Sequence, residues 1–181
     1  MKRFKNYLLG VGSFVLVLLM YSGCAWQRIP AAPEYSVPAP LPISVGVVLA
    51  DTHWTGIYGP GIVGLWKEMR VFKGITYPYL EGDQVDGIIT LRIDGGWKEH
   101  GAGAGVLIGL TLGLASTAVG PSMTGTHDAI AALKKGMSEA ARYSAHVETT
   151  VEWGLGANTS EVAKKTDDLQ RRKLAVEVAS K

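Results

Sequence analysis

The sequence predicts an α+β fold: one small domain with a sheet of three or four mostly antiparallel strands, and two or three helices on one face of that sheet. Two stretches, 85–93 and 145–153, alternate between apolar and polar residues, which is typical of half-buried strands. Other stretches carry apolar residues three and four positions apart, which is the spacing of a helix face. A glycine-rich apolar insert, 101–120, carries no charge and separates the two alternating stretches.

The N-terminal residues have the layout of a secretory signal peptide. A basic start is followed by an apolar run over Tyr7–Met20, and then by Ser22 and Gly23 directly before Cys24. This ending resembles the lipobox of bacterial lipoproteins. The resemblance implies that residues 1–23 are removed, and that Cys24 takes a diacylglyceryl group and becomes the new N-terminus, with acyl chains such as palmitate. Two alternatives stay open: an uncut membrane anchor, although a span needs about 20 apolar residues, and a cleaved protein without lipid.

The sequence after Gly23 indicates where the mature chain is located and which partners it can bind. By resemblance to the sorting rule of enteric bacteria, Ala25 after Cys24 favours the outer membrane, with the protein facing the periplasm. Without residues 1–23, the chain keeps 15 basic and 16 acidic residues, a balance that argues against binding to nucleic acid. Cys24 is the only cysteine. Its lipidation would leave no thiol for a disulfide, a metal site or a nucleophile.

Residues 24–42 are predicted to be a lipidated cysteine followed by a proline-rich tether. Five prolines fall within residues 25–42, and proline fixes φ and removes an amide donor, so neither a helix nor a central strand is expected. An extended chain is predicted instead. Its expected role is to hold the domain, residues 43–181, away from the lipid surface.

The first half of the domain is expected to contain one strand and one helix. Residues 43–50 predict a central strand, because both of its faces are apolar or small. Residues 51–60 predict a loop, because it contains glycine and proline. Residues 62–72 predict a helix with one apolar stripe, and a short strand over 71–77 is an alternative. The loop contains three ring side chains that either cap the end of the core or form a binding surface: His53, Trp54 and Tyr58.

The two alternating stretches are expected to pair as antiparallel neighbours with matched lengths. One face of each would lie on the core and the other would face solvent. Across such a pair, Arg92 would meet Glu148 or Glu152.

Two more helices are expected in the second half of the domain. Residues 126–142 carry an apolar helical stripe with Thr126 as a good N-cap, although Gly136 weakens the middle of this helix. A capping-box-like sequence at 158–161 opens the predicted helix over 160–180, which carries one apolar and one charged face. The charged face is interpreted as a solvated surface.

The insert 101–120 contains four glycines spaced four residues apart: Gly101, Gly105, Gly109 and Gly113. On a helix they would form a smooth strip that a second helix can approach closely. Three interpretations stay open: a buried core helix or loop, a segment that contacts or spans a membrane, and a subunit-packing element that is buried only in an oligomer. Twenty apolar residues are long enough for a span.

The predicted order of elements resembles two families of bacterial envelope proteins. A long apolar excursion between two matched strands is similar to lipoproteins related to the TolB N-terminal domain and to the curli secretion channel. The resemblance implies a small α/β domain. For the channel family it also implies inserted segments that enter the membrane after a ring has assembled.

No arrangement of residues predicts catalysis, a metal site or a cofactor. The four histidines lack metal-ligand spacing: His53, His100, His127 and His146. His127 is interpreted as a polar residue in the first turn of the helix at 126–142. No nucleophile motif or phosphate-binding loop is present in the sequence.

The function that the sequence favours is therefore a non-catalytic envelope lipoprotein with a structural or assembly role. The expected partners are the membrane, through the lipid anchor, and a second copy of the chain or another envelope protein, but not nucleic acid. One alternative is a subunit of an oligomeric export or pore assembly that uses the insert. A further alternative is an envelope hydrolase.

Overall fold

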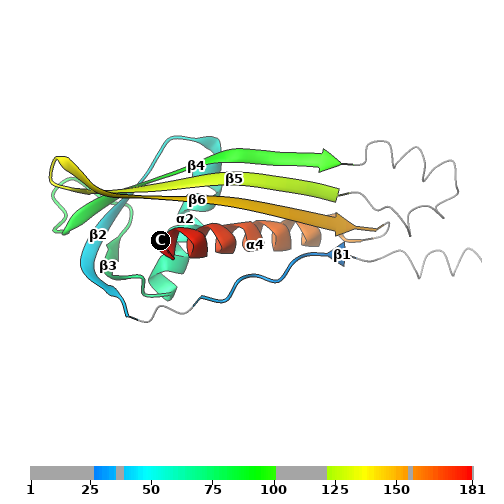
Figure 1. Cartoon of the computed structure of the whole chain (residues 1–181), viewed down its shortest axis with the longest axis horizontal. Coiled ribbons are helices and arrows are strands. Elements are labelled where there is room, and N and C mark those ends of the chain that lie inside the picture. The colour runs from blue at the N-terminus through cyan, green and yellow to red at the C-terminus, as the bar shows by residue number, and fades with distance from the viewer. Residues whose placement is uncertain (1–26, 36–38, 101–121, 155–156, 181) are drawn as a thin grey trace, which may run out of the picture. The chain divides into compact units, whose positions relative to one another are not determined.

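The computed structural model of the chain describes residues 27–35, 39–100, 122–154 and 157–180. Residues 1–23, Cys24 and the insert 101–120 lie outside this part. The described residues form two helices and six strands, so the fold is α+β (Figure 1). The elements are β1 (Gln27–Arg28), β2 (Leu41–Leu49), α2 (His53–Glu68), β3 (Phe72–Thr76), β4 (Gly87–His100), β5 (Ser122–Lys135), β6 (Ser138–Trp153) and α4 (Thr159–Ala179). Neither of these helices combines the length and the apolar character needed to cross a bilayer.

The strands form one mixed sheet in the order β1-β6-β5-β4-β2-β3. β2 runs parallel to both β3 and β4, whereas β1 runs antiparallel to β6. The predicted sheet of three or four mostly antiparallel strands is therefore wrong in strand number and in the directions around β2. The physical reason is the connection after β2: parallel strands need a crossover, and α2 supplies it between β2 and β3.

Residue contacts divide the chain into two compact units. The first takes its described residues from Met1–Ile29, Glu99–Met123 and Thr150–Lys165, and the second from Pro30–Lys98, Thr124–Thr149 and Thr166–Lys181. Within the first unit, β1 pairs with the end of β6, and Arg28 Nη1 lies 3.5 Å from Glu152 Oε2. The large hydrophobic core cluster belongs to the second unit.

The core of the second unit lies between the sheet and the two helices. Alternate residues of β4 are buried, among them Ile89, Leu91 and Ile93, as are Ala145 and Val147 of β6. The predicted alternation of both stretches is confirmed. Residues of α2 and α4 complete the same cluster: Tyr58, Ile62, Val63, Trp66, Leu174, Ala175 and Val178.

Helix α2 begins at His53, so the predicted loop over 51–60 is wrong and the predicted helix over 62–72 starts too late. Thr52 caps the helix by accepting a hydrogen bond from the Thr55 amide at 3.3 Å. Glycines in this helix allow close packing, because a Cβ at Gly59 would meet a side chain of β2 and a Cβ at Gly61 would meet one of α4. The glycines that suggested a loop are therefore packing positions in a helix.

The short strand considered over 71–77 is present as β3. The peptide chain leaves α2 after Glu68 and enters β3 at Phe72. The predicted helix that would continue to Phe72 is wrong at this end as well.

Residues 126–142 form two strands joined by a turn, so the predicted helix in this region is wrong. β5 and β6 are neighbours in the sheet and are linked by Gly136 and Met137. Gly136 has φ of 63°, which is the left-handed conformation that hairpin turns use. The sequence of β5 is rich in alanine and favours a helix by local propensity, but burial of Ala129 and Ala131 against the core overrides that preference.

The extra hairpin changes the predicted strand pairing. β5 lies between β4 and β6, so the stretches 85–93 and 145–153 are not neighbours. Arg92 pairs with Asp94 of its own strand, with Nε 2.6 Å from Oδ2, and not with Glu148 or Glu152. The resemblance to the TolB-related and curli families depended on a long apolar excursion between two matched strands, 85–93 and 145–153. Because β5 lies between these two stretches in the sheet, the order of elements on which that resemblance rested is not found.

The C-terminal helix is confirmed, with α4 in place of the predicted 160–180. Asn158 caps it by accepting a hydrogen bond from the Glu161 amide at 3.2 Å. Buried apolar residues line one face of this helix: Val162, Leu169, Leu174, Ala175 and Val178.

Candidate functional site

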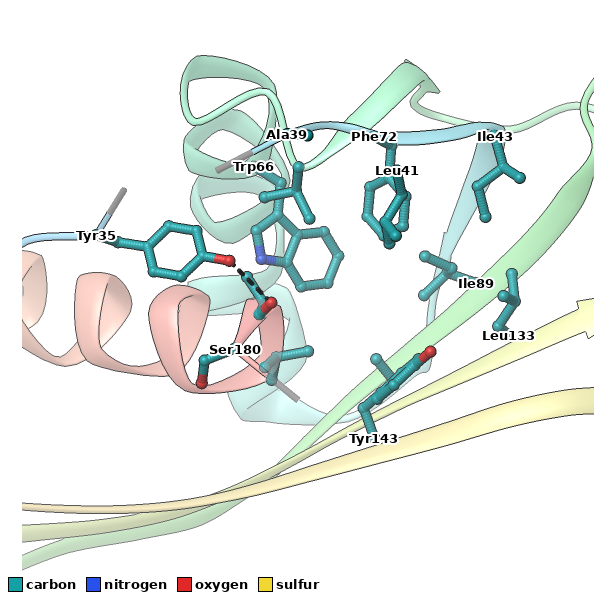
Figure 2. Close-up of a pocket in the computed structure, with 14 residues that line it drawn as sticks. Tyr35, Ala39, Leu41, Ile43, Trp66, Phe72, Ile89, Leu133, Tyr143 and Ser180 are labelled. Carbon is teal, nitrogen blue, oxygen red and sulfur yellow. Dashed lines mark hydrogen bonds between the residues drawn. The ribbon is translucent and has the colours of Figure 1, made fainter. Parts of the chain in front are cut away.

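An apolar pocket of about 350 Å³ opens in the second unit. Figure 2 shows side chains from the strands and both helices pointing into it. Six of the apolar lining residues are Leu41, Ile43, Trp66, Phe72, Ile89 and Leu133. Pockets that bind small molecules usually range from about 300 to 1,000 Å³ and have mostly apolar walls, so this pocket lies at the small end of that range.

Two aromatic rings that line the pocket, Trp66 and Phe72, are held in place by their contacts. Trp66 of α2 is buried, and its Nε1 donates a hydrogen bond to the Ala175 carbonyl of α4 at 3.0 Å. Its ring meets the ring of Phe72 edge to face, with centroids 6.2 Å apart. Because the indole N–H is already satisfied, Trp66 presents carbon surface to the pocket.

The tether supplies another wall of the pocket. Tyr35 is partly buried against the core, and its hydroxyl donates a hydrogen bond to the Ala179 carbonyl at 3.0 Å (Figure 2). Leu41 at the start of β2 also lines the pocket. The prediction that residues 24–42 act only as a spacer is therefore wrong for its second half, because an aromatic side chain there packs on the core.

The pocket contains few polar groups. The described lining residues provide three side-chain hydroxyls, from Tyr35, Tyr143 and Ser180, and include no carboxylate, imidazole, thiol or cation. The Tyr35 hydroxyl is bound to Ala179, and Ser180 Oγ is bound to the Glu177 carbonyl at 3.1 Å. The arrangement favours binding of an apolar group and gives no acid, base or nucleophile pair for chemistry.

A second cluster joins three side chains by hydrogen bonds in the core. Trp97 Nε1 donates to the Tyr58 hydroxyl at 3.1 Å, and that hydroxyl donates to Asp167 Oδ1 at 3.1 Å. Burial raises the pKa of Tyr58 to about 12, and the nearby Asp167 carboxylate adds to the rise. Tyr58 therefore stays protonated, and its role in this cluster is to connect Trp97 with Asp167.

His127 lies buried in the same region of the second unit. The rings of Trp54, Tyr58 and Trp97 meet it edge to face, with centroids 4.7, 5.2 and 5.8 Å away. The Gln170 amide nitrogen lies 2.9 Å from His127 Nδ1 and donates to it, which leaves the proton on Nε2. Burial lowers the pKa of His127, so the ring is neutral at neutral pH.

The location of His127 corrects the prediction that it is a polar residue in a helix turn. It belongs to β5 and has no exposed surface. His127 Nε2 and Gln170 Oε1 are buried and have no hydrogen-bond partner among the described residues. Trp97, Asp167 and Gln170 were not predicted to be part of a cluster. The alternation of Gly125, His127, Ala129 and Ala131 was the signal of a strand that would have placed His127 inside.

The three rings predicted to cap the core or to form a binding surface have different positions. Tyr58 is fully buried, and Trp54 stacks on it with centroids 5.7 Å apart. His53 is exposed and touches Trp54 edge to face at 5.0 Å. Two of the three rings therefore close the core, as the capping interpretation expected.

The remaining histidines lie on the surface. His146 Nδ1 is 2.7 Å from Asp128 Oδ1, and both side chains are exposed. His100 is exposed at the end of β4. Within residues 27–35, 39–100, 122–154 and 157–180, no group of three or more potential metal-binding side chains comes together. Cys24 and the predicted packing glycines Gly101, Gly105, Gly109 and Gly113 lie outside the described residues.

No protein-family model and no curated protein matches this sequence. Among solved structures, the chain is similar to a Xanthomonas campestris protein of the DUF330 family. The identity is 12% and the TM-score 0.49, over 83% of this chain and 90% of that one. It is also similar to a candidate lipoprotein from Caulobacter crescentus, at 11% identity and a TM-score of 0.40, over 75% of this chain and 82% of that one. Neither is described as a TolB or curli protein. At these values the function has to be inferred from the residues of this chain.

Proposed function

We propose that this chain is a non-catalytic lipoprotein of the bacterial cell envelope, anchored through Cys24, and that its pocket holds an acyl chain of an envelope lipid. The outer membrane, with the domain facing the periplasm, is the proposed location. The observation that carries the proposal is the lining of the pocket, which is apolar except for three hydroxyls. Such a lining favours a hydrocarbon ligand over a charged one.

Burial of hydrocarbon supplies the proposed driving force. Each buried methylene contributes about 0.8 kcal/mol, so even part of an acyl chain would bind usefully in a pocket with fixed walls. The Tyr143 hydroxyl lies at the pocket and forms no hydrogen bond to other described residues (Figure 2). It is free to bond to the ester or carboxyl end of the ligand.

The proposed anchor keeps the pocket within reach of a membrane. Tyr35 follows Cys24 by 11 residues, and an extended chain covers at most about 3.3–3.6 Å per residue. A lipidated Cys24 therefore limits the distance from the bilayer to the pocket wall to roughly 40 Å along the chain.

A second copy or another envelope protein would act as a partner in the proposed assembly role. The export or pore function that depends on 101–120 stays a prediction.

A photoactivatable fatty acid tests the proposal. It is added to membranes that contain the full chain, and the labelled peptides are identified by mass spectrometry. Peptides that contain Phe72 or Ile89 should be labelled. Leu133→Trp fills the pocket and should abolish this labelling, whereas Leu80→Trp changes a residue that is 67% exposed and lies outside the pocket, and should preserve it. Equal labelling of these peptides in both variants would refute acyl-chain binding in the pocket.

A further inference from the structure

β3 forms one edge of the sheet, and its outer side has no neighbour among the described strands. A second groove, of about 540 Å³, is lined in part by four residues of this edge strand, Phe72–Ile75. Its described lining residues come from the start of β2, the end of α2 and β3 itself. Five of them offer apolar surface: Pro40, Leu41, Pro42, Phe72 and Ile75. An edge strand carries backbone N–H and C=O groups that can accept another strand.

The rim of this groove is basic. Lys67, Arg70 and Lys73 line it and are exposed, and no acidic residue is among the described lining. None of the three forms an ion pair with another described residue. Three positive charges of this kind beside an apolar floor are complementary to a ligand that carries negative charge.

Arg70 is held in a backbone conformation that favours glycine. Its φ is 54°, and it is the only non-glycine residue with positive φ in the described part of the chain. The Val71 amide donates to the Trp66 carbonyl at 3.1 Å, which is the helix ending that usually has glycine at this position. An arginine here costs folding stability. A strained residue of this kind supports a role outside folding.

We infer that the groove binds an extended, acidic segment of a partner protein, which adds to the sheet as a strand beside β3. Backbone hydrogen bonds to the edge would give affinity, while the basic rim would select acidic side chains and the apolar floor would take the residues between them. The groove shares Leu41 and Phe72 with the acyl-chain pocket, whereas its basic residues, Lys67, Arg70 and Lys73, do not line that pocket. The inference does not depend on the ligand proposed for that pocket.

Protection of a bare edge is the competing explanation. A lysine on a short edge strand discourages pairing with other chains, and β3 has only five residues with Lys73 near its middle. A lysine that only prevents pairing at the edge strand needs neither an arginine in a strained conformation nor an apolar groove beside it. Lys67 also lies in the last turn of α2, where a cation is favourable for the helix itself. The experiment therefore depends on Arg70 and Lys73.

The test uses the full chain in detergent and a fluorescent eight-residue peptide of alternating Glu and Val, measured by anisotropy. The peptide should bind, added salt should weaken it, and methylation of its alternate backbone nitrogens should abolish it. Lys73→Glu should weaken binding about tenfold, because it replaces one exposed attraction with a repulsion. Lys164→Glu, the same change on an exposed residue of α4, should have no effect.

Arg70→Gly separates binding from folding. It should raise the urea midpoint, because glycine relieves the positive φ, and at the same time weaken peptide binding. The inference is overturned if the methylated peptide binds as well as the plain one, or if Lys73→Glu binds like Lys164→Glu. It is also overturned if these variants lose binding only to vesicles that contain phosphatidylglycerol, since the groove would then be a surface for anionic lipid.

Discussion

The Tyr35 hydroxyl donates a hydrogen bond to the Ala179 carbonyl at 3.0 Å, and so joins the segment before β2 to the last residue of α4. The two residues are 144 positions apart in the chain and both line the apolar pocket. The bond holds an aromatic wall in place over the end of the helix. It also links the proposed lipid tether to the core. Movement of the tether would therefore move a residue that lines the pocket.

Removal of the Tyr35 hydroxyl should loosen this wall. Tyr35→Phe keeps the ring and leaves the Ala179 carbonyl without its donor, so the free energy of unfolding should fall by about 1 kcal/mol in a urea titration. Tyr143→Phe is the matched control, because that hydroxyl forms no bond to another described residue. A loss of the same size in both variants would contradict the role given to the Tyr35 bond.

Stability should fall in mildly acidic solution because of His127. Burial lowers the pKa of this ring below the ordinary value of 6.5. As the pH drops below about 6.5, His127 becomes protonated in the unfolded chain while it is still neutral in the folded chain. The free energy of unfolding therefore decreases. The decrease is complete once the pH is below the pKa of the folded state.

Urea titrations between pH 8 and pH 5 measure this effect. His127→Gln should be less stable at pH 8, because the buried ring and its edge-to-face contacts with Trp54, Tyr58 and Trp97 are lost, but its stability should depend less on pH. An unchanged slope in His127→Gln would show that other groups cause the acid sensitivity.

Lipidation at Cys24 should be required for processing. Cys24→Ser should leave a precursor with residues 1–23 attached, which is larger on a gel and carries no radiolabelled palmitate after metabolic labelling. Cys24 is the only cysteine in the chain, so the label can report on no other thiol. Normal processing and unchanged partitioning into detergent in this variant would exclude the lipoprotein assignment.

The insert 101–120 should be dispensable for folding but needed for assembly. β4 and β5 flank it and are neighbours in the sheet, so a Gly-Ser turn can join them. The shortened chain should keep a cooperative unfolding transition by circular dichroism. In the full chain, Gly105→Leu combined with Gly109→Leu should block oligomers in crosslinking experiments and leave the monomer folded, because bulky side chains prevent close approach of helices.

A loss of cooperative unfolding in the shortened chain would favour the core interpretation of the insert. The double leucine variant would then also unfold, because extra volume in a packed core is destabilising. Unaltered oligomers in a folded double variant would instead exclude the glycine strip as the packing surface.

The sequence alone determined the features that depend on local pattern. Alternation showed which residues of β4 and β6 face the core, and the capping sequence at Asn158 with its apolar stripe located α4. These predictions succeeded because each strand or helix buries one face, and the spacing of the apolar residues in the sequence gives the period of the buried positions. The lipobox-like ending at Cys24 is also readable locally, although it remains a prediction.

Only the tertiary structure decided which elements are neighbours and which local preferences are overridden. The alanine-rich residues of β5 favour a helix in isolation, but the sheet uses them as a strand because small side chains fit against the core. The glycines of α2 look like loop residues until β2 and α4 pack against them. The pocket joins residues far apart in the chain, and so does the contact of His127 with Gln170. Their contacts depend on folding as a whole, which no local period encodes.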